Sequence, residues 1–281
     1  MINKQTMYKY HQENVLAIQQ GMKYTLENIK NGIINEHLSN ESHQKRRHKR
    51  YVLIQTRILS GLVVSWSETI IKRLYYEPNA FSDIQIQKLH ELNLQQKWEF
   101  ALKVAFCKAY NVSPSNDTPL FNHIDIESQT NIPRSARDRY RHIKNLITNE
   151  LLPAINIRNK VQHGEWLKAF EPPNSLEFSR ELTRDVNRED IISLQTKINQ
   201  FKAIYQLIHD LAVFKQGNAA VTFERDFDKN YHRIESNRIL ASNRTQRKYI
   251  EDIIGRYERG LDWKQRNRGG IVTRTINRII N

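Results

Sequence analysis

The chain has 281 residues and carries 44 Lys and Arg against 30 Asp and Glu, a formal net charge of +14. Hydrophobic residues make up 39% of it, enough for a packed core, which excludes a wholly disordered chain. No apolar run approaches the ~18 residues of a membrane span, and the N-terminus lacks a signal-peptide core, so we expect no membrane association. The one cysteine, Cys107, cannot form an internal disulfide, which fits a reducing, cytoplasmic setting. The positive charge favours a polyanionic partner, most simply nucleic acid.

Long helices are indicated first by the scarcity of turn residues, because the whole chain has only 9 Gly and 7 Pro. Apolar residues at three- and four-residue steps predict a helix around residues 15–33. A second long helix is expected from about His48 to Tyr76, with a stripe through Tyr51, Ile54, Ile58, Leu62, Ser65, Thr69 and Leu74. It is apolar on more than one face around Leu62 to Trp66. Helical sequence then continues over residues 82–106, followed by a loop over 111–132.

The second half of the chain continues the helical pattern. A basic helix is expected from Arg134 to about Asn149, and Pro153 suits the first turn of the next helix. The cleanest apolar stripe follows Asp190 and comprises Ile191, Leu194, Ile198, Phe201, Tyr205, Ile208 and Ala212. We therefore predict an all-α fold with three parts. These are an N-terminal helical extension with a basic linker (1–50), an antiparallel bundle (51–215) and a basic helical appendage (217–281).

Positive charge is concentrated in three stretches: His43–Arg57, Arg134–Lys160 and the C-terminal segment from Gly217. The first contains six Lys and Arg and no acid. Such clusters bind phosphates without sequence preference, although each one alone could be ordinary solubility charge. The side chains that we expect to contact the polyanion are Lys45, Arg46, Arg47, Arg50, Arg137, Arg141 and Lys160.

No pattern in the sequence indicates a metal or nucleotide cofactor. His43 and His48 lie inside a basic run that would repel a cation, and His123 lacks further ligands nearby. His209-Asp210 is similar to the paired ligands of metal phosphohydrolases, but the other ligands are missing. The chain also lacks a phosphate-binding glycine-rich loop and a Gly-x-Ser-x-Gly elbow.

One constellation suggests chemistry: Arg158-Asn-Lys-Val-Gln-His-Gly164. Asn159 and His163 are four residues apart and share a helical face, while Arg158 lies about 140° around the helix from His163 and could still reach the same pocket. Gly164 removes side-chain bulk beside the histidine. An imidazole transfers protons near neutral pH and a guanidinium binds phosphate bidentately, which together could cleave a phosphodiester without metal. From spacing alone, a surface arginine and a helix-capping histidine fit equally well.

This segment, in its helical context, resembles the Arg-polar-x3-His motif of the HEPN superfamily. The resemblance extends in pattern to Trp66-Ser-Glu68, to Gln96–Phe100 and to the long helix after Asn187, and so covers about residues 50–215. It implies a HEPN-like bundle and a metal-independent endoribonuclease without cofactors, in which two protomers form a homodimer with a composite cleft. Arg158 and His163 would be the catalytic pair, Asn159 would orient groups in the site, and Glu68 is either a further site residue or surface charge paired with Lys72.

The resemblance further implies that RNA is cleaved by attack of a ribose 2′-OH, and that the chain acts as a toxin or antiphage effector of abortive infection with an antitoxin or defence-system partner. Two alternatives remain open at this point. One is a non-catalytic RNA-binding or scaffold bundle, and the other is a subunit that binds a partner protein, with Arg158 and His163 on an ordinary helix surface.

Overall fold

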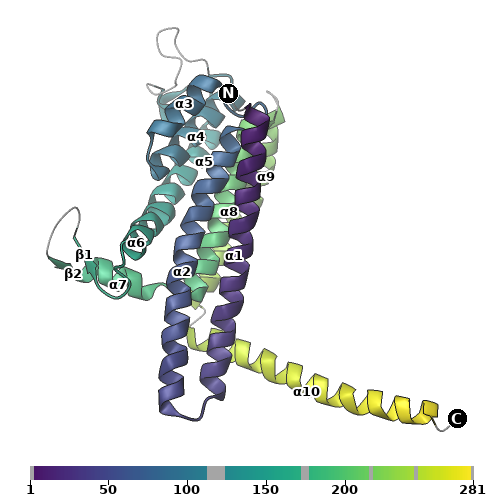
Figure 1. The fold of residues 1–281 in the computed structure, drawn as a ribbon. Coiled ribbons are helices and arrows are strands. Elements are labelled where there is room, and N and C mark those ends of the chain that lie inside the picture. Colours follow the sequence, from purple (N-terminus) through teal and green to yellow (C-terminus); the bar gives the residue numbers. More distant parts are fainter. Residues whose placement is uncertain (1–2, 113–123, 172–176, 215–217, 244–245, 280–281) are drawn as a thin grey trace.

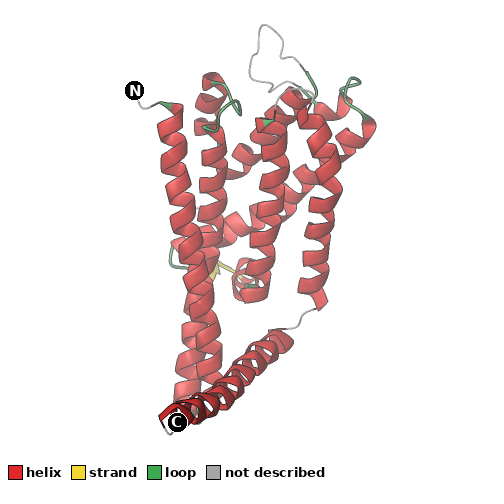
Figure 2. Ribbon diagram, turned by 90° about the vertical axis from the view of Figure 1, so that its right-hand side faces the viewer, coloured by secondary structure: helices red, strands yellow, loops and turns green. Residues whose placement is uncertain are grey.

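The computed structural model describes residues 3–112, 124–171, 177–214, 218–243 and 246–279, with side chains described up to residue 263 except over 240–246. Half of the loop expected at 111–132, residues 113–123, lies outside the described residues. The described chain is almost entirely helical, which confirms the all-α prediction, and the exception is one short pair of strands (Figure 2). No described helix combines the length and the apolar character needed to cross a membrane.

Helices α1 (Lys4–Leu38) and α2 (Ser42–Tyr75) form a long antiparallel hairpin along one side of the molecule (Figure 1). The predicted stripe of α1 is confirmed, since Val15, Met22, Ile29 and Ile33 are buried in the main core. Gly32 lets the two helices approach closely, because a Cβ there would lie 2.7 Å from Val52 Cγ2. These contacts make α1 part of the bundle core rather than an extension to it.

The basic linker expected before residue 51 is instead helix. α2 begins at Ser42 and is continuous to Tyr75, so residues 45–50 project from its first turns. Residues 42–60 contain no proline or glycine, and packing of α2 against α1 stabilises a helix that its run of like charges disfavours.

Only part of the expected α2 stripe meets the core. Tyr51, Ile54 and Ile58 are 39%, 37% and 39% exposed, whereas Leu74 at the other end of the stripe is fully buried. The rest of the buried side of α2 is formed by residues outside the stripe, which are Leu59, Val63, Trp66 and Ile70. Both faces of this helix are apolar, so periodicity alone could not identify the one that packs inward.

Two short helices follow where the sequence suggested one helical stretch. α3 (Asp83–Glu91) and α4 (Leu94–Ala109) are separate because Asn93 begins a new helix. The side chains of Asn93 and Gln96 each accept the other's backbone N–H, which is a capping box, and Ser82 and Gln85 do the same for α3. A short 3-10 helix, η1 (Ile126–Ser128), then leads towards the next long helix.

The helix that carries the candidate motif is reached through a π turn. α5 (Arg134–Leu146) continues through η2 (Ile147–Leu151) into α6 (Leu152–Gln162) without a break. Pro153 lacks an N–H and cannot continue the α-helical hydrogen bonds, and the wider turn comes immediately before it. α6 packs along α2 in the opposite direction (Figure 1).

After α6, strands β1 (Ala169–Phe170) and β2 (Phe178–Ser179) pair antiparallel and lead into α7 (Arg180–Arg188). α8 (Ile191–Val213) buries all seven residues of its predicted stripe, so that prediction is confirmed. α9 (Asn218–Asn243) packs on α8 and buries Phe223, Phe227 and Ile234 in the main core, so this part of the expected appendage belongs to the bundle. α10 (Gln246–Ile279) projects from the lower end of the molecule (Figure 1).

Candidate active site

The candidate motif occupies the last turns of α6 and the residues that end it. The N–H of Glu165 donates to the Lys160 carbonyl (2.9 Å) and that of Gly164 to the Val161 carbonyl (3.1 Å), the two bonds of a Schellman motif. Gly164 has φ +82°, in the left-handed region that favours glycine. A Cβ there would meet nothing within 4 Å, so the backbone conformation, and not clearance beside His163, requires glycine.

His163 caps this helix end and its side chain is exposed. Its backbone N–H donates to the carbonyl of Asn159 (3.1 Å), whose side chain is also exposed. Among the described residues, no hydrogen bond or ion pair joins His163 to Arg158. The imidazole therefore faces solvent at the end of α6, about 7.5 Å along the helix axis from the level of Arg158.

Arg158, in contrast, is held against α2. Its side chain is only 16% exposed, and Nη2 lies 3.8 Å from Glu68 Oε2. Nη1 donates to Gln162 Oε1 (2.9 Å), while Nε is buried with no hydrogen-bond partner. The guanidinium is thus oriented by neighbours on both α2 and α6, and its buried Nε–H remains without a hydrogen-bond partner.

Glu68 sits among three cations. Lys72 Nζ donates to its Oε1 at 2.7 Å, and Arg158 and Lys97 contribute further positive charge. Burial alone would raise the pKa of Glu68, but the Lys72 hydrogen bond and the three positive charges lower it below its usual value. One carboxylate faces three cations, so the surroundings of Arg158 have an excess of positive charge that suits a phosphate.

Sequence reasoning did not place Lys97 or Gln162 at this site, and it considered Lys72 only as a surface partner of Glu68. Lys97 comes from α4, far from the motif in the chain. Only the (i, i+4) spacings of Glu68 with Lys72 and of Arg158 with Gln162 could have indicated the local pairs.

The segment after the motif is anchored by Arg57, a fully buried arginine on α2. Its Nε donates to the Trp166 carbonyl (3.2 Å) and its Nη2 to Asn187 Oδ1 (3.1 Å). Burial lowers the pKa of Arg57, and the charge of Glu189 opposes that shift. This arginine, which the sequence grouped with the exposed basic run, ties α2 to the loop that follows His163.

A small second core supports the same region. Ile157 and Val161 of α6 pack with Val186 of α7 and with Trp166. The indole N–H of Trp166 donates to the Val161 carbonyl at 2.7 Å. The last turns of α6, the loop and α7 therefore form one packed unit against α2.

The seven basic residues expected to bind a polyanion divide into two groups. Lys45, Arg46, Arg47 and Arg50 are exposed on α2, with no ion pair among the described residues. The remaining three form hydrogen bonds or ion pairs with other residues of the chain, and they are Arg137, Arg141 and Lys160. Arg141 contacts both Glu127 (2.7 Å) and Asp138 (2.9 Å).

Arg137 Nη1 donates to the Glu127 carbonyl (2.9 Å). Lys160 lies 3.3 Å from Glu165 Oε2 and donates to the carbonyl of Phe170. These two side chains are thus engaged in holding the protein's own backbone, and the exposed α2 group is the stronger candidate for a polyanion contact.

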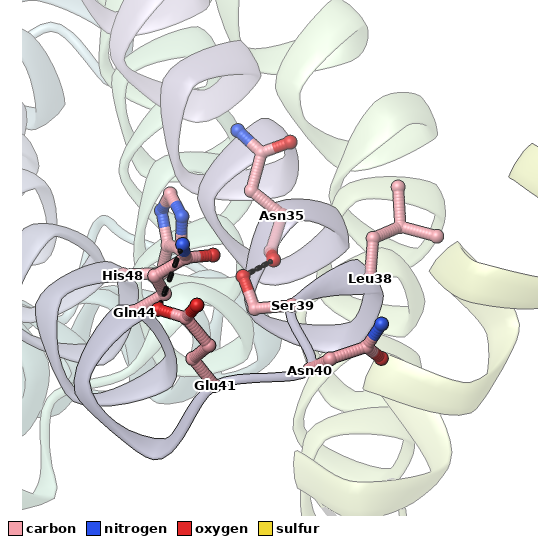
Figure 3. A pocket seen from close by; sticks show the side chains of 7 residues that line it. All are labelled: Asn35, Leu38, Ser39, Asn40, Glu41, Gln44 and His48. Atoms are coloured by element: carbon pink, nitrogen blue, oxygen red, sulfur yellow. Dashed lines mark hydrogen bonds between the residues drawn. The ribbon is translucent and has the colours of Figure 1, made fainter.

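A polar hollow lies at the tip of the α1–α2 hairpin, next to the exposed basic group (Figure 3). Ser39 donates to the Asn35 carbonyl (2.6 Å) and Gln44 to Glu41 Oε2 (3.1 Å), so these groups satisfy one another. His48 and Glu41 both line it, but they are not part of any group of three metal-binding side chains in the part of the chain that the structure describes.

His209 is engaged by carboxylates in the bundle rather than by the motif. Its Nε2 lies 3.1 Å from Glu77 Oε1 and its Nδ1 3.5 Å from Asp210 Oδ1. Burial would lower the pKa of His209, but the hydrogen bonds and charges of Asp210 and Glu77 raise it to about 9.

Within the described residues, no three His, Cys, Asp or Glu side chains converge as a metal site. Burial raises the pKa of Cys107 to about 12, which leaves it an unreactive thiol.

Comparisons of the chain with models of known protein families, with curated proteins and with solved structures give no match.

Proposed function

We propose that the chain is a HEPN-type, metal-independent endoribonuclease, with Arg158 and His163 as its catalytic pair. The observation that carries this proposal is the contrast between these two side chains on α6. Glu68 and Gln162 orient a half-buried guanidinium, and an imidazole at the same helix end stays open to solvent. A fixed cation and an accessible proton carrier are what phosphodiester cleavage without metal needs.

In the proposed reaction, neutral His163 accepts the proton of a ribose 2′-OH as that oxygen attacks the adjacent phosphorus, or protonated His163 donates to the departing 5′-oxygen. The P–O5′ bond breaks, leaving a 2′,3′-cyclic phosphate and a 5′-hydroxyl. Arg158 stabilises the additional negative charge on the phosphorane-like transition state. Asn159, exposed one turn before His163, is placed to orient the ribose or the phosphate. Because the attack needs a 2′-OH, DNA is not cleaved.

We further propose that the site is completed by a second copy of the chain. Arg158 and His163 make no contact within one protomer, so the partner subunit can supply the complementary group. The exposed apolar stripe of Tyr51, Ile54 and Ile58 runs along α2, the helix that also presents Glu68 to α6. Its burial in a two-fold interface would bring the two α6 ends towards one cleft.

The exposed basic group of Lys45, Arg46, Arg47 and Arg50 would hold the RNA backbone. It occupies the N-terminal part of α2, the same helix that contacts the motif through Glu68 and the loop after the motif through Arg57. In this proposal the RNA follows α2 from the hairpin tip towards α6. A cytoplasmic toxin or antiphage effector, restrained by an antitoxin or defence-system partner, is the cellular role that fits such an activity.

A non-catalytic RNA-binding or scaffold bundle is the second candidate. The observation that favours it is that His163 caps α6 and Arg158 pairs with Glu68, both of which are ordinary structural roles. In that case the basic group on α2 would bind RNA and no bond would be cleaved.

The deciding experiment is RNA cleavage in EDTA by the wild-type chain, Arg158→Ala and His163→Ala. We expect wild-type cleavage with cyclic-phosphate ends, and a loss of at least about a hundredfold in each variant. Arg225→Ala and His232→Ala, two exposed positions on α9, are matched controls. Cleavage that survives in both motif variants, or that stops in EDTA, contradicts the mechanism.

A further inference from the structure

A pair of exposed aromatic rings lies immediately beyond the motif. Phe170 of β1 is directly opposite Phe178 of β2, so their side chains share one face of the strand pair. The rings are 42% and 44% exposed, and Leu167 beside them is 54% exposed. Ala169 and Ser179 lie on the other face of the strand pair, and both are buried. The two phenylalanines therefore contribute little to the core and present their rings to solvent.

The backbone of Phe170 is hydrogen-bonded to the turn that contains His163. The N–H of Phe170 donates to Glu165 Oε2 at 2.7 Å, and Lys160 donates to the carbonyl of the same phenylalanine. Lys160 lies three residues before His163 and Glu165 two residues after it, and they form an ion pair at 3.3 Å. Both backbone polar groups of Phe170 are thus bonded to residues on either side of His163, which holds β1 next to the turn that contains the imidazole.

The rest of the segment is held equally firmly. Arg57 binds the Trp166 carbonyl, Asn187 donates to the Leu167 carbonyl (3.4 Å), and the N–H of Ala169 donates to Thr183 Oγ1 (2.8 Å). A rigid aromatic surface loses little conformational entropy when a ligand binds to it.

The charge around the rings suits an anionic ligand. Lys168 Nζ lies 5.2 Å from the centroid of Phe178, and Lys168 is exposed. Glu165, two residues after His163, is already paired with Lys160. Glu171 and Glu177 lie just outside the two strands, where the N–H of Glu171 donates to the carbonyl of Glu177 (3.1 Å). A ligand that offers both a flat π surface and a phosphate would meet an aromatic face and a cation together.

We propose that Phe170 and Phe178 form a stacking platform for an unpaired base of the RNA that the motif cleaves. This inference rests on the proposed function and specifies its substrate class. Unstacked bases in loops and single strands stack on aromatic side chains, whereas the bases of a duplex are unavailable. The chain therefore selects single-stranded or looped RNA, with one base held on the platform while the adjoining phosphate lies near His163 and Arg158.

The test is equilibrium binding of the full chain to a single-stranded RNA and to the duplex of the same sequence, using Phe178→Leu and Phe178→Tyr. Leucine keeps the apolar volume and removes the π face, while tyrosine keeps the ring. We expect Phe178→Leu to bind the single strand about tenfold more weakly and Phe178→Tyr to bind it like wild type, with duplex binding unchanged in both. The same pair at Phe170 is expected to behave alike. Because both rings are exposed, thermal unfolding should not change in any variant.

Equal single-strand binding by the leucine variants would overturn the platform. A leucine variant that keeps its RNA affinity but changes its mass in sedimentation would also overturn it, and would identify the rings as a contact with a second copy. Binding is measured without reference to cleavage. If the single strand needs the rings but is not cut in EDTA, the platform stands and the proposed ribonuclease activity fails.

Discussion

Arg158 Nη2 lies 3.8 Å from Glu68 Oε2, and this pair joins the motif helix α6 to α2 across 90 residues of chain. Glu68 is bonded at the same time to Lys72, so its carboxylate is fixed from its own helix before it meets the guanidinium. The pair therefore orients Arg158 without neutralising its surroundings, since Lys72 and Lys97 keep the local charge positive.

Glu68→Gln should slow RNA cleavage by about tenfold while RNA binding is retained, because the amide keeps the shape but no longer attracts the guanidinium. The measurement is single-turnover cleavage at saturating enzyme. Lys72→Met is the matched control, since it removes the other partner of Glu68 and leaves the Arg158 contact in place. An unchanged rate in Glu68→Gln would show that the pair does not position Arg158.

Gly164→Ala should destabilise the fold by about 1–2 kcal/mol, because an alanine at φ +82° is strained although space for its Cβ is open. Gly21→Ala serves as the control. Gly21 lies inside helix α1 and a Cβ there would make ordinary contact with Leu62 of α2, so this substitution should stabilise the fold by about 0.5–1 kcal/mol. Urea unfolding of both variants tests this, and effects of the same sign would contradict the Schellman assignment.

Ile54→Glu combined with Ile58→Glu should convert a dimer into a monomer and abolish cleavage, because charges would be buried in the proposed interface. Sedimentation should show the mass falling to the 33.4 kDa of one chain. Ile84→Glu, at a still more exposed isoleucine on α3, should change neither property. A wild-type chain that is monomeric at all concentrations with full activity would exclude the composite site.

Replacing Lys45, Arg46, Arg47 and Arg50 by glutamine should weaken RNA binding and lower the slope of log K against log salt by about 2–3. These side chains are exposed, and no ion pair involves them within the described chain. Arg141→Gln should leave the slope almost unchanged, because Glu127 and Asp138 already occupy that guanidinium. Equal slopes for wild type and the fourfold variant would remove this surface from the RNA path.

The pH dependence of stability should contain a contribution from His209. Its pKa is raised to about 9 in the folded chain, so its stabilisation is fully present below the ordinary value near 6.5 and is lost as pH rises through about 9. The wild type should therefore melt several degrees above His209→Gln at pH 6, and this difference should become smaller above pH 9. His232→Gln, at an exposed histidine, is the control. If the melting temperature of the wild type exceeded that of His209→Gln by the same amount at both pH values, the Glu77–His209–Asp210 contacts would be contradicted.

Helices α2 and α8 show how well the buried face of a helix can be predicted from the sequence of this chain. Every residue of the predicted α8 stripe is buried, and Ile192, Ile204 and Leu207 on its other faces are buried as well, because neighbouring helices cover most of α8. α2 has apolar residues on two faces, and the first part of its predicted stripe, through Ile54 and Ile58, is exposed whereas Leu74 at its other end is buried. Periodicity states which residues share a face, but not which face meets another helix.

The sequence by itself determined the all-α class and the places where basic residues gather. These follow from local rules of spacing, turn residues and charge, which act within a few residues. It did not determine where α6 ends, because the helix expected to continue through Trp166 to just before Pro172 stops at Gln162. Only the tertiary structure decided that Glu68 meets Arg158, that Arg57 is buried under Trp166, and that Phe170 is tied to the motif turn. The first two contacts join segments 90 and more residues apart, and the third depends on how the chain folds back after Gly164. All three are set by the packing of α6 and α7 against α2, which no local pattern specifies.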